Sequence, residues 1–166
     1  MKYLTHIILL FLIACGSPSY ATYSTNNINP VSRVVDGDTV VFCVRPNSEK
    51  VKGRLLGIDT PETKHPKKPV EPFGPEATAF AQKWLAGHDE WVELINEQDD
   101  IDGMDRYKRF LIWVVCDDEI LNVELVRAGL AKIELYGNRN LKYVLELHEA
   151  EGEAKAASRG IWSDIK

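Results

Sequence analysis

The stretch VVDGDTVVFCV, residues 34–44, sets the fold of this chain. Two valines precede an Asp-Gly pair, and a run of β-branched and aromatic residues extends from Thr39 to Val44. Such residues favour strands, whereas Asp-Gly favours a tight turn. The stretch therefore predicts a bent strand or a hairpin.

Similar apolar runs predict three more strands further along the chain. They cover residues 51–58, 91–95 and 110–116, each bounded by polar or Pro-rich segments. Residues 64–75 hold four of the eight prolines and predict an irregular loop. An acidic loop covers residues 96–105.

Three helices are expected, each from a different signal. Pro75 suits the first turn of a helix, and Asn122 suits an N-cap. A last helix is expected over residues 140–158, with Gly160 after it. Apolar side chains at helical spacing predict the buried faces of the first and last helices. These are Ala77, Ala81, Trp84 and Leu85 in the first, and Leu141, Val144, Leu145 and His148 in the last.

The order of these elements favours an α+β fold, a five-stranded OB-type barrel with three packed helices. A length of 166 residues, 45% apolar and 27% charged, fits one globular domain and excludes a disordered or multi-span membrane protein. We expect a signal over residues 1–21, a flexible tether over 22–31 and the folded domain over 32–166. The net charge of −5 excludes a generally basic surface, so any nucleic-acid contact needs a few placed cations or a metal.

The first residues predict a secretory signal. Lys2 is followed by an apolar run, residues 7–15, that is too short to span a bilayer. Two endings remain open: a lipoprotein signal that makes Cys15 the lipidated first residue, or ordinary cleavage after Ala21. Either ending predicts an exported protein, and the first adds a lipid anchor to a membrane.

The cysteines and histidines do not form a metal-binding pattern. Cys43 and Cys116 each lie in an expected strand, and the sequence leaves open whether they are buried free thiols, which we expect, or a disulfide. The four histidines are scattered and no Cys-x-x-Cys motif is present, so a zinc site is not supported.

The segment from Arg54 to Glu62 carries charged and hydroxyl side chains of the kinds that take part in catalysis and metal binding. An arginine inside an apolar strand is costly unless it meets an anion. Asp59, Thr60 and Glu62 follow on a turn fixed by Pro61, which adds a hard oxygen ligand and a general base to the guanidinium. A structural Arg–Asp pair is the alternative interpretation.

Two further clusters carry charge at turns. Asp36 and Asp38 flank Gly37, so one carboxylate is available to a hard cation while the other stabilises the turn. Residues 105–109 (DRYKR) surround a tyrosine with three cations, which suits a phosphate and a base or sugar. Ordinary solvated turns are the alternative in both places.

Several of these motifs together resemble the staphylococcal-type thermonuclease (micrococcal nuclease) family. The likeness covers roughly residues 32–163, nearly all of the expected mature chain. The second block is the most specific, and the blocks follow the order of the family. They are VDGDTV (35–40), RLL (54–56) followed by DTPETKHPKK (59–68), FGPEA (73–77), DRYKR (105–109), LVRAGLA (125–131) and IWS (161–163).

The resemblance implies an OB-fold, Ca²⁺-dependent phosphodiesterase. It implies hydrolysis of DNA and RNA to products with 3′-phosphates, and we expect the chain to act as a monomer. Asp38 and Asp59 would give carboxylates to Ca²⁺, and Thr60 its backbone carbonyl. The acidic loop before Arg109 is not an EF-hand, because Gly103 at its sixth position places that arginine at the twelfth.

The remaining motif residues would act on the substrate. Arg54 and Arg109 would hold and neutralise the scissile phosphate, charge stabilisation that phosphoryl chemistry requires. Glu62 would orient or deprotonate the attacking water. Arg106 and Tyr107 would contact the nucleotide.

Two departures from the family pattern bear on these roles. Lys108 stands where the family usually has glycine, which predicts either a strained turn before Arg109 or an added phosphate contact. After Lys132 only Tyr136 is available to cover a base. A catalytically inactive OB-fold nucleic-acid-binding module is the alternative function, and it would be expected to lose Arg54, Glu62 or Arg109, all of which are present.

Overall fold

The structure is a computed structural model that describes residues 28–44, 49–64, 67, 69–88, 92–96, 104–136 and 140–163. The expected signal, including Cys15, lies outside these residues. Strand β1, Ile28–Asp36, begins inside the segment expected as a tether. Ile28 is paired with Val44 and Val31 with Phe42. The tether prediction over 22–31 is therefore wrong from residue 28 onward, because the hairpin partner supplies hydrogen bonds that the local sequence does not reveal.

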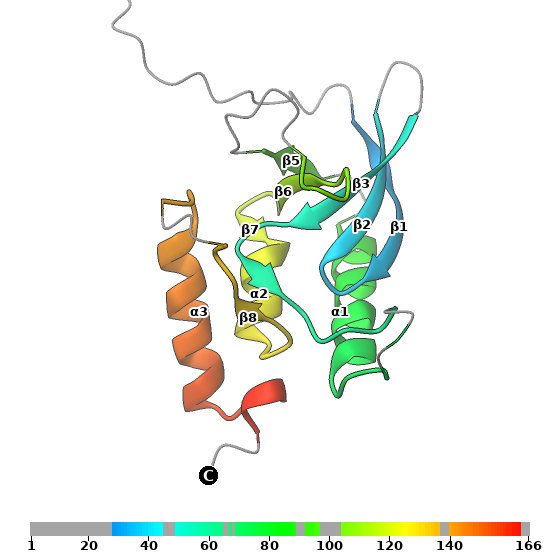
Figure 1. The fold of residues 1–166 in the computed structure, drawn as a ribbon. Helices are drawn as coiled ribbons and strands as arrows, with labels where there is room; N and C mark the ends of the chain where they lie inside the picture. Colours follow the sequence, from blue (N-terminus) through cyan, green and yellow to red (C-terminus); the bar gives the residue numbers. More distant parts are fainter. Residues whose placement is uncertain are drawn as a thin grey trace, which may run out of the picture.

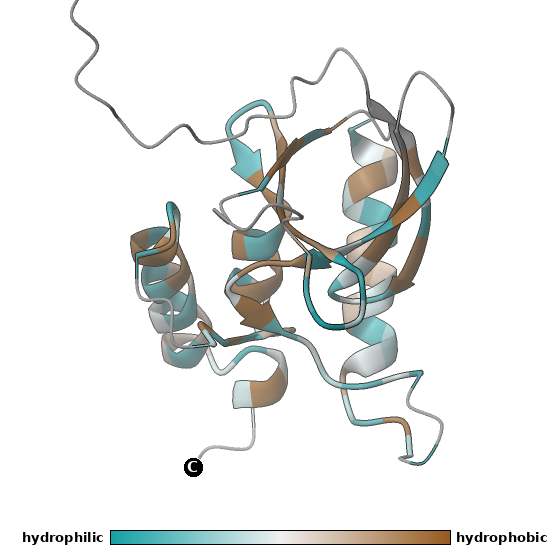
Figure 2. Ribbon diagram, turned by 45° about the horizontal axis from the view of Figure 1, so that its top comes forward, coloured by the Kyte–Doolittle hydropathy of each residue, from teal (hydrophilic) through white to brown (hydrophobic). Residues whose placement is uncertain are grey.

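Six strands form one mixed sheet that positions the rest of the molecule (Figure 1). β1, β2 (Thr39–Val44) and β3 (Glu49–Leu55) are antiparallel neighbours, which confirms the expected hairpin. β3 then pairs in parallel with β6 (Phe110–Cys116). β5 (Glu93–Ile95) and β7 (Glu119–Ile120) are antiparallel to β6. Figure 2 shows these strands curving in an OB-type arrangement, and their buried apolar side chains form part of one core. Within the described residues β1 and β5 are not paired, so the sheet is not closed into the expected barrel.

The described residues form three α-helices beside this sheet, two packed on it and the third on the second helix, so the expected α+β class is confirmed. Helix α1, Gly74–Gly87, packs on β1 and buries the four predicted side chains, from Ala77 to Leu85. Helix α2, Leu121–Arg127, lies between β6 and α3, Val144–Ala156. The chain continues into a 3₁₀ turn, Gly160–Trp162.

The second predicted strand, 51–58, is broken by a turn at Gly57. The backbone there has φ +74°, a left-handed conformation that glycine adopts without steric cost. A short strand β4, Ile58–Asp59, follows and pairs with β8, Lys132–Ile133. The turn therefore directs Asp59 and the residues after it away from the main sheet.

Two helix predictions are wrong in detail. Asn122 is not an N-cap: α2 begins at Leu121, and the buried Asn122 amide donates to the carbonyl oxygens of Leu56 (2.9 Å) and Ile112 (3.2 Å). In α3 the buried side chains are Leu147, Ala150 and Ala154. Leu145 and His148 are exposed, because the buried face of the helix passes through positions 147, 150 and 154, at three- and four-residue spacing, and two of these are alanines.

Cys43 and Cys116 are thiols and are not joined by a disulfide, as expected, and both are half-buried. Cys43 lies near the end of β2, whereas Cys116 ends β6 beyond the paired part of β3. Within the described ranges, no helix has the length and apolar character that a bilayer crossing requires. The signal expected over residues 1–21 and the lipid anchor at Cys15 stay predictions, because they lie outside the described residues.

Candidate active site

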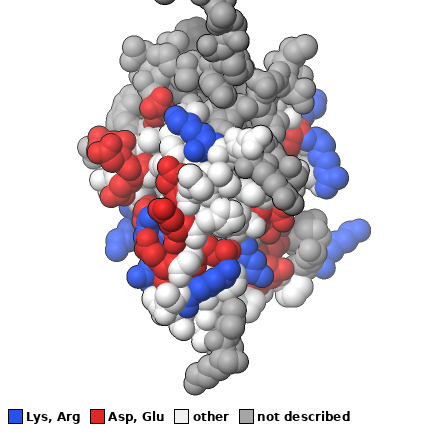
Figure 3. All heavy atoms as spheres, turned by 90° about the vertical axis from the view of Figure 1, so that its left-hand side faces the viewer, with Lys and Arg blue, Asp and Glu red and all other residues white. Residues whose placement is uncertain are grey.

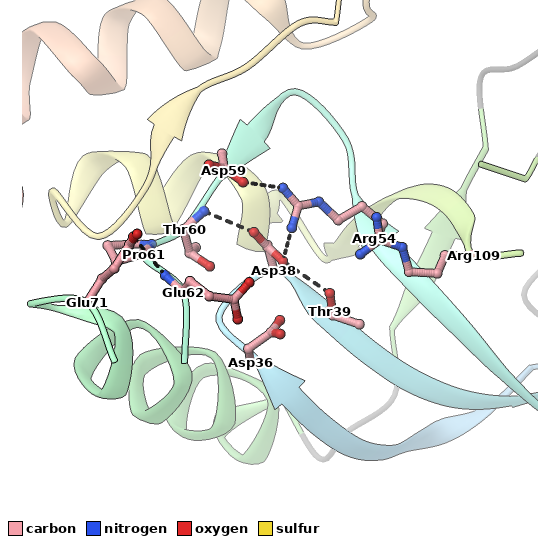
Figure 4. Close-up of a pocket in the computed structure, with 10 residues that line it drawn as sticks. All are labelled: Asp36, Asp38, Thr39, Arg54, Asp59, Thr60, Pro61, Glu62, Glu71 and Arg109. Carbon is pink, nitrogen blue, oxygen red and sulfur yellow. Dashed lines mark hydrogen bonds and ion pairs between the residues drawn. The ribbon is translucent and has the colours of Figure 1, made fainter. Parts of the chain in front are cut away.

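A polar pocket of about 240 Å³ gathers the predicted functional residues (Figure 4). It opens where the β1–β2 turn, β3, the chain after β4 and the turn before β6 meet. All three predicted catalytic residues line it, together with the predicted metal ligands. Its lining consists of Asp36, Asp38, Thr39, Arg54, Asp59, Thr60, Pro61, Glu62, Glu71 and Arg109.

The β1–β2 turn places Asp38 at the buried end of the pocket. A Cβ at Gly37 would lie 2.7 Å from the Ala77 Cβ and 2.8 Å from the Thr60 Oγ1, so only glycine lets this turn pack so closely. Asp38 is 2% exposed, and its carboxylate accepts hydrogen bonds from the Thr60 backbone N–H (2.9 Å) and the Thr39 hydroxyl (3.1 Å). The turn and the chain after β4 therefore hold one another in register.

Arg54 lies on β3 and joins two carboxylates that the sequence separates widely. It forms an ion pair with Asp38 through Nη1, and its Nη2 lies 2.6 Å from Asp59 Oδ1. Nη2 also donates to the Ile58 carbonyl at 3.1 Å. Burial alone would lower the pKa of Arg54, but Asp38 and Asp59 hold it above its ordinary value. The expected need of this buried arginine for an anion is thus met inside the protein.

Three further carboxylates surround this pair. Figure 4 shows the Glu62 side chain directed toward Asp36 and Asp38, and one of its oxygens accepts the Lys64 backbone N–H at 2.7 Å. Glu71 accepts the Glu62 backbone N–H at 3.1 Å, which ties the loop back to the start of α1. Burial, followed by repulsion from Asp38, raises the pKa of Asp36 to about 6. The pocket therefore holds more negative charge than its arginines neutralise.

Arg109 reaches the same pocket from a compact turn. Asp105 accepts the Arg109 backbone N–H at 3.0 Å and its Nε–H at 2.8 Å. Partial burial pushes the pKa of Asp105 upward, but the hydrogen bonds from Arg109 and Tyr107 lower it below its ordinary value. Lys108 adopts φ +59°, so the predicted left-handed position is present, and the lysine occupies it without displacing Arg109 from the pocket.

Comparison with known proteins identifies the family. The family model described as "Staphylococcal nuclease homologue" matches residues 52–164. The chain is 34% identical to the thermonuclease of Staphylococcus intermedius over 94% of its own length and 90% of that protein. It is also 34% identical to the Staphylococcus hyicus thermonuclease, covering 81% and 75% of the two chains, and to endonuclease YncB of Bacillus subtilis, covering 80% and 60%.

The chain belongs to the staphylococcal nuclease family. It is therefore a nuclease with the OB-type fold that its motifs predicted. In this nuclease, Asp38, Arg54, Asp59, Glu62 and Arg109 all line one pocket, as the motifs implied.

The two predicted nucleotide-contacting residues lie outside the pocket lining. Tyr107 is 62% exposed, with the guanidiniums of Arg106 and Arg109 at 4.8 Å and 5.3 Å from its ring centroid. Tyr136, on the chain after β8, is also absent from the pocket lining, but its hydroxyl lies 3.5 Å from Arg54 Nη2. These aromatic side chains thus mark the edges of the nuclease pocket beside its two arginines.

The motifs gave Glu71 no role, and they did not predict the contacts that Asp105 and Tyr136 make. A signal was present for Asp105, because an acid four residues before an arginine at a turn indicates a local pair. Glu71 lies in a Pro-rich loop without regular spacing, and Tyr136 is 82 residues from the arginine that it contacts. Only the folded nuclease reveals these two contacts.

The donor set fits a hard divalent cation. Five carboxylates and two guanidiniums line the pocket, and the buried Asp36 Oδ1 has no hydrogen-bond partner among the described residues. Carboxylate and carbonyl oxygens are the ligands that Ca²⁺ prefers. Within those residues, however, no three Asp, Glu, His or Cys side chains form a ready metal cage. The fit therefore rests on donor chemistry and on the excess negative charge.

Proposed function

We propose that this nuclease is a Ca²⁺-dependent endonuclease that hydrolyses DNA and RNA to products with 3′-phosphates. The observation that carries the proposal is the convergence of Arg54, Glu62 and Arg109 with the carboxylates of Asp38 and Asp59 on one pocket. Guanidiniums, a base and oxygen ligands are the groups that phosphodiester attack requires. The relatives named thermonuclease and endonuclease support the same class of reaction.

The charge of the pocket explains why a cation is part of the proposal. A phosphodiester anion would meet five carboxylates against two guanidiniums. Asp38, Asp59 and the Thr60 carbonyl are the groups that would hold Ca²⁺. When bound, the ion supplies positive charge at the phosphoryl oxygens, where negative charge gathers during attack.

The side chains have separable roles in this proposal. Arg54 and Arg109 bind the phosphate and neutralise its charge, and a planar guanidinium can do so with two hydrogen bonds. Glu62 orients or deprotonates the attacking water, because its carboxylate is directed into the pocket while the Lys64 N–H holds one of its oxygens. The exposed Tyr107, with Arg106 over its ring, contacts the nucleotide outside the pocket.

The face of the molecule that carries α3 does not favour a polyanion. Figure 3 shows the face that carries α3, where acidic side chains predominate and basic ones are interspersed. In our proposal the arginines and the cation of the pocket hold the nucleic acid, and this face adds little. Affinity that depends on a few phosphate contacts is weak and falls as the salt concentration rises.

A digestion assay tests the proposal. Double-stranded DNA and RNA are incubated with the purified chain in CaCl₂ or in EDTA, and product ends are analysed with a phosphatase-dependent ligation. We expect internal cleavage in Ca²⁺, none in EDTA, and 3′-phosphate ends. The control for a general loss of fold is Arg127→Met. Arg127 does not line the pocket, and it forms ion pairs with Glu124 of α2 and Glu153 of α3. Binding without cleavage in Ca²⁺ would instead support the inactive OB-fold module.

We also propose that the chain is exported, on the basis of the apolar run at residues 7–15 after Lys2. Mass spectrometry of the mature N-terminus separates the two endings. A diacylglyceryl group on Cys15 supports the lipid anchor, whereas a chain beginning at Thr22 supports cleavage after Ala21. An intact Met1 terminus would contradict export by either route.

A further inference from the structure

The Arg54 guanidinium lies between two carboxylates that the proposed function assigns to a cation. Nη1 pairs with Asp38 Oδ1, and Nη2 lies 2.6 Å from Asp59 Oδ1 (Figure 4). Arg54 and Asp38 are 8% and 2% exposed. Charges so deeply buried must neutralise one another, because neither is solvated by water. In this arrangement Arg54 provides the positive charge that a metal ion would otherwise provide.

The donors of Arg54 are unevenly used. Nη2 has three acceptors within 3.5 Å: the Asp59 carboxylate, the Ile58 carbonyl and the Tyr136 hydroxyl. Its Nε is buried and has no hydrogen-bond partner among the described residues. Buried donors without partners are rare and call for a physical explanation. The two Nη nitrogens of Arg54 therefore have acceptors, whereas the Nε, which lies nearer to β3, has none among the described residues.

One guanidinium cannot serve both carboxylates and a phosphate in full. Bidentate phosphate binding needs two parallel N–H donors, and every such pair of a guanidinium includes at least one Nη. Both Nη nitrogens already donate to Asp38 and Asp59, so the free Nε can offer only a single hydrogen bond. Resting on the proposed function, we propose that Arg54 is an internal counter-cation. It neutralises Asp38 and Asp59 until a divalent cation takes over those carboxylates, and only then becomes available to the phosphodiester. The protein thereby loads its cation before it can hold its substrate.

Unfolding temperatures with and without Ca²⁺ test the exchange without any measurement of activity. Arg54→Met removes the guanidinium while keeping an unbranched side chain. In EDTA we expect Tm to fall by about 5 °C or more, because buried Asp38 loses its partner. In saturating CaCl₂ the difference from wild type should shrink to about 2 °C or less. The matched control is Arg127→Met, because Arg127 also bridges two carboxylates, Glu124 and Glu153. Its Tm deficit should be the same in both buffers.

A deficit of Arg54→Met that is equal in EDTA and in Ca²⁺ would overturn the exchange, since Arg54 would then keep its carboxylates when the cation binds. If Ca²⁺ raises the Tm of neither wild type nor Arg54→Met, the proposed Ca²⁺ dependence fails together with this inference. If Ca²⁺ raises the Tm of the wild type but the Tm deficit of Arg54→Met persists, only the exchange is refuted. The two failures are therefore distinguishable.

A second measurement on the wild-type chain covers the case in which Arg54→Met does not fold in EDTA. Exchange of the arginine Nη protons with water is followed by ¹H–¹⁵N NMR at low temperature during a CaCl₂ titration without nucleic acid, with Arg54 assigned from Arg54→Lys. Release from the carboxylates should speed exchange of the Arg54 Nη protons, which now bind Asp38 and Asp59, at least tenfold. The Arg127 Nη1 protons, which pair with Glu124, should not change. An unchanged Arg54 rate at saturating Ca²⁺ would refute the exchange.

Discussion

The two arginines of the pocket are held in opposite ways. Arg54 lies on a strand, is nearly buried, and pairs with acids that two other segments of the chain supply. Arg109 lies at the end of a turn and pairs with Asp105, four residues earlier, with 24% of its side chain exposed. The guanidinium of Arg54 is thus held by tertiary contacts in the interior, whereas that of Arg109 is held by a local turn.

This difference separates the consequences of changing each arginine. A buried pair that loses one member leaves an uncompensated charge in the interior, which costs roughly 3–5 kcal/mol. A partly exposed pair contributes much less, because water replaces the lost partner. Arg54 should therefore carry both stability and activity, whereas Arg109 should carry activity almost alone.

The largest expected effect comes from replacing each arginine by lysine. Both changes should lower kcat/KM by about 10²–10³, because a point charge cannot reproduce the planar fork. Arg54→Lys should also lower Tm in EDTA by several degrees, and Arg109→Lys should leave Tm almost unchanged. Digestion kinetics in Ca²⁺ and thermal unfolding in EDTA measure the two properties. Near-normal activity of Arg54→Lys would refute the bidentate role, and equal Tm losses would erase the contrast.

A change at Glu62 tests whether the carboxylates around Arg54 divide their tasks. Glu62→Gln keeps the shape and the acceptor for the Lys64 N–H but removes the base, so kcat should fall by about 10² while KM stays close to wild type. Glu71→Gln is the matched control, because that side chain lines the same pocket without a catalytic role in our proposal. A raised KM with unchanged kcat at Glu62→Gln would show that the base assignment is wrong.

The contrast between the arginines also explains what the sequence could predict. The Asp105–Arg109 pair is local, so the DRYKR motif carried a signal for it, although we did not predict the pair. The left-handed position at Lys108 was expected because the resembled family usually has glycine there. The partners of Arg54 depend on the β1–β2 turn and on β4, which meet only after the sheet forms. The motifs indicated that an anion was needed, and the fold determined which anions.

The prediction of elements followed the same rule. The run 110–116 and the face of α1 were predicted correctly, because apolar spacing and a starting proline are local signals. The start of β1 was not, because Ile28 is held by a partner strand. Asparagine is a residue type that favours N-caps, yet the Asn122 side chain accepts the Val114 N–H and donates to the Leu56 carbonyl in the core. Tertiary contacts outweighed local preference in both cases.

The pH dependence of stability should have opposite signs in the two regions. The pKa of Asp36 is raised from 3.8 to about 6, so between these values the folded chain binds more protons than the unfolded chain, and stability falls as pH rises. The pKa of Asp105 is lowered, so its contribution is present above its ordinary pKa and is lost as pH falls through the lower folded value.

Two amide variants isolate these contributions. In EDTA at pH 7, Asp36→Asn should raise the free energy of unfolding, by at most about 3 kcal/mol, because the ionised carboxylate is no longer buried beside Asp38. Asp105→Asn should lower it by about 1 kcal/mol, because charge-assisted hydrogen bonds are lost. Urea unfolding from pH 4 to 8 measures both. A wild-type pH slope that persists in Asp36→Asn would assign the titration to another group.

The smallest effect is expected at Lys108, and it decides what this departure from the family pattern does. A non-glycine residue at φ +59° costs about 1 kcal/mol, part of which glycine returns through its freedom in the unfolded chain. Lys108→Gly should therefore raise the free energy of unfolding by roughly 0.5 kcal/mol. Its kcat should stay within about twofold of wild type, because Asp105 already fixes both the backbone and the side chain of Arg109.

A tenfold rise in the kcat of Lys108→Gly would mean that the lysine had misplaced Arg109. If instead KM rises and the dependence of binding on salt weakens by about one phosphate contact, Lys108 touches the substrate backbone.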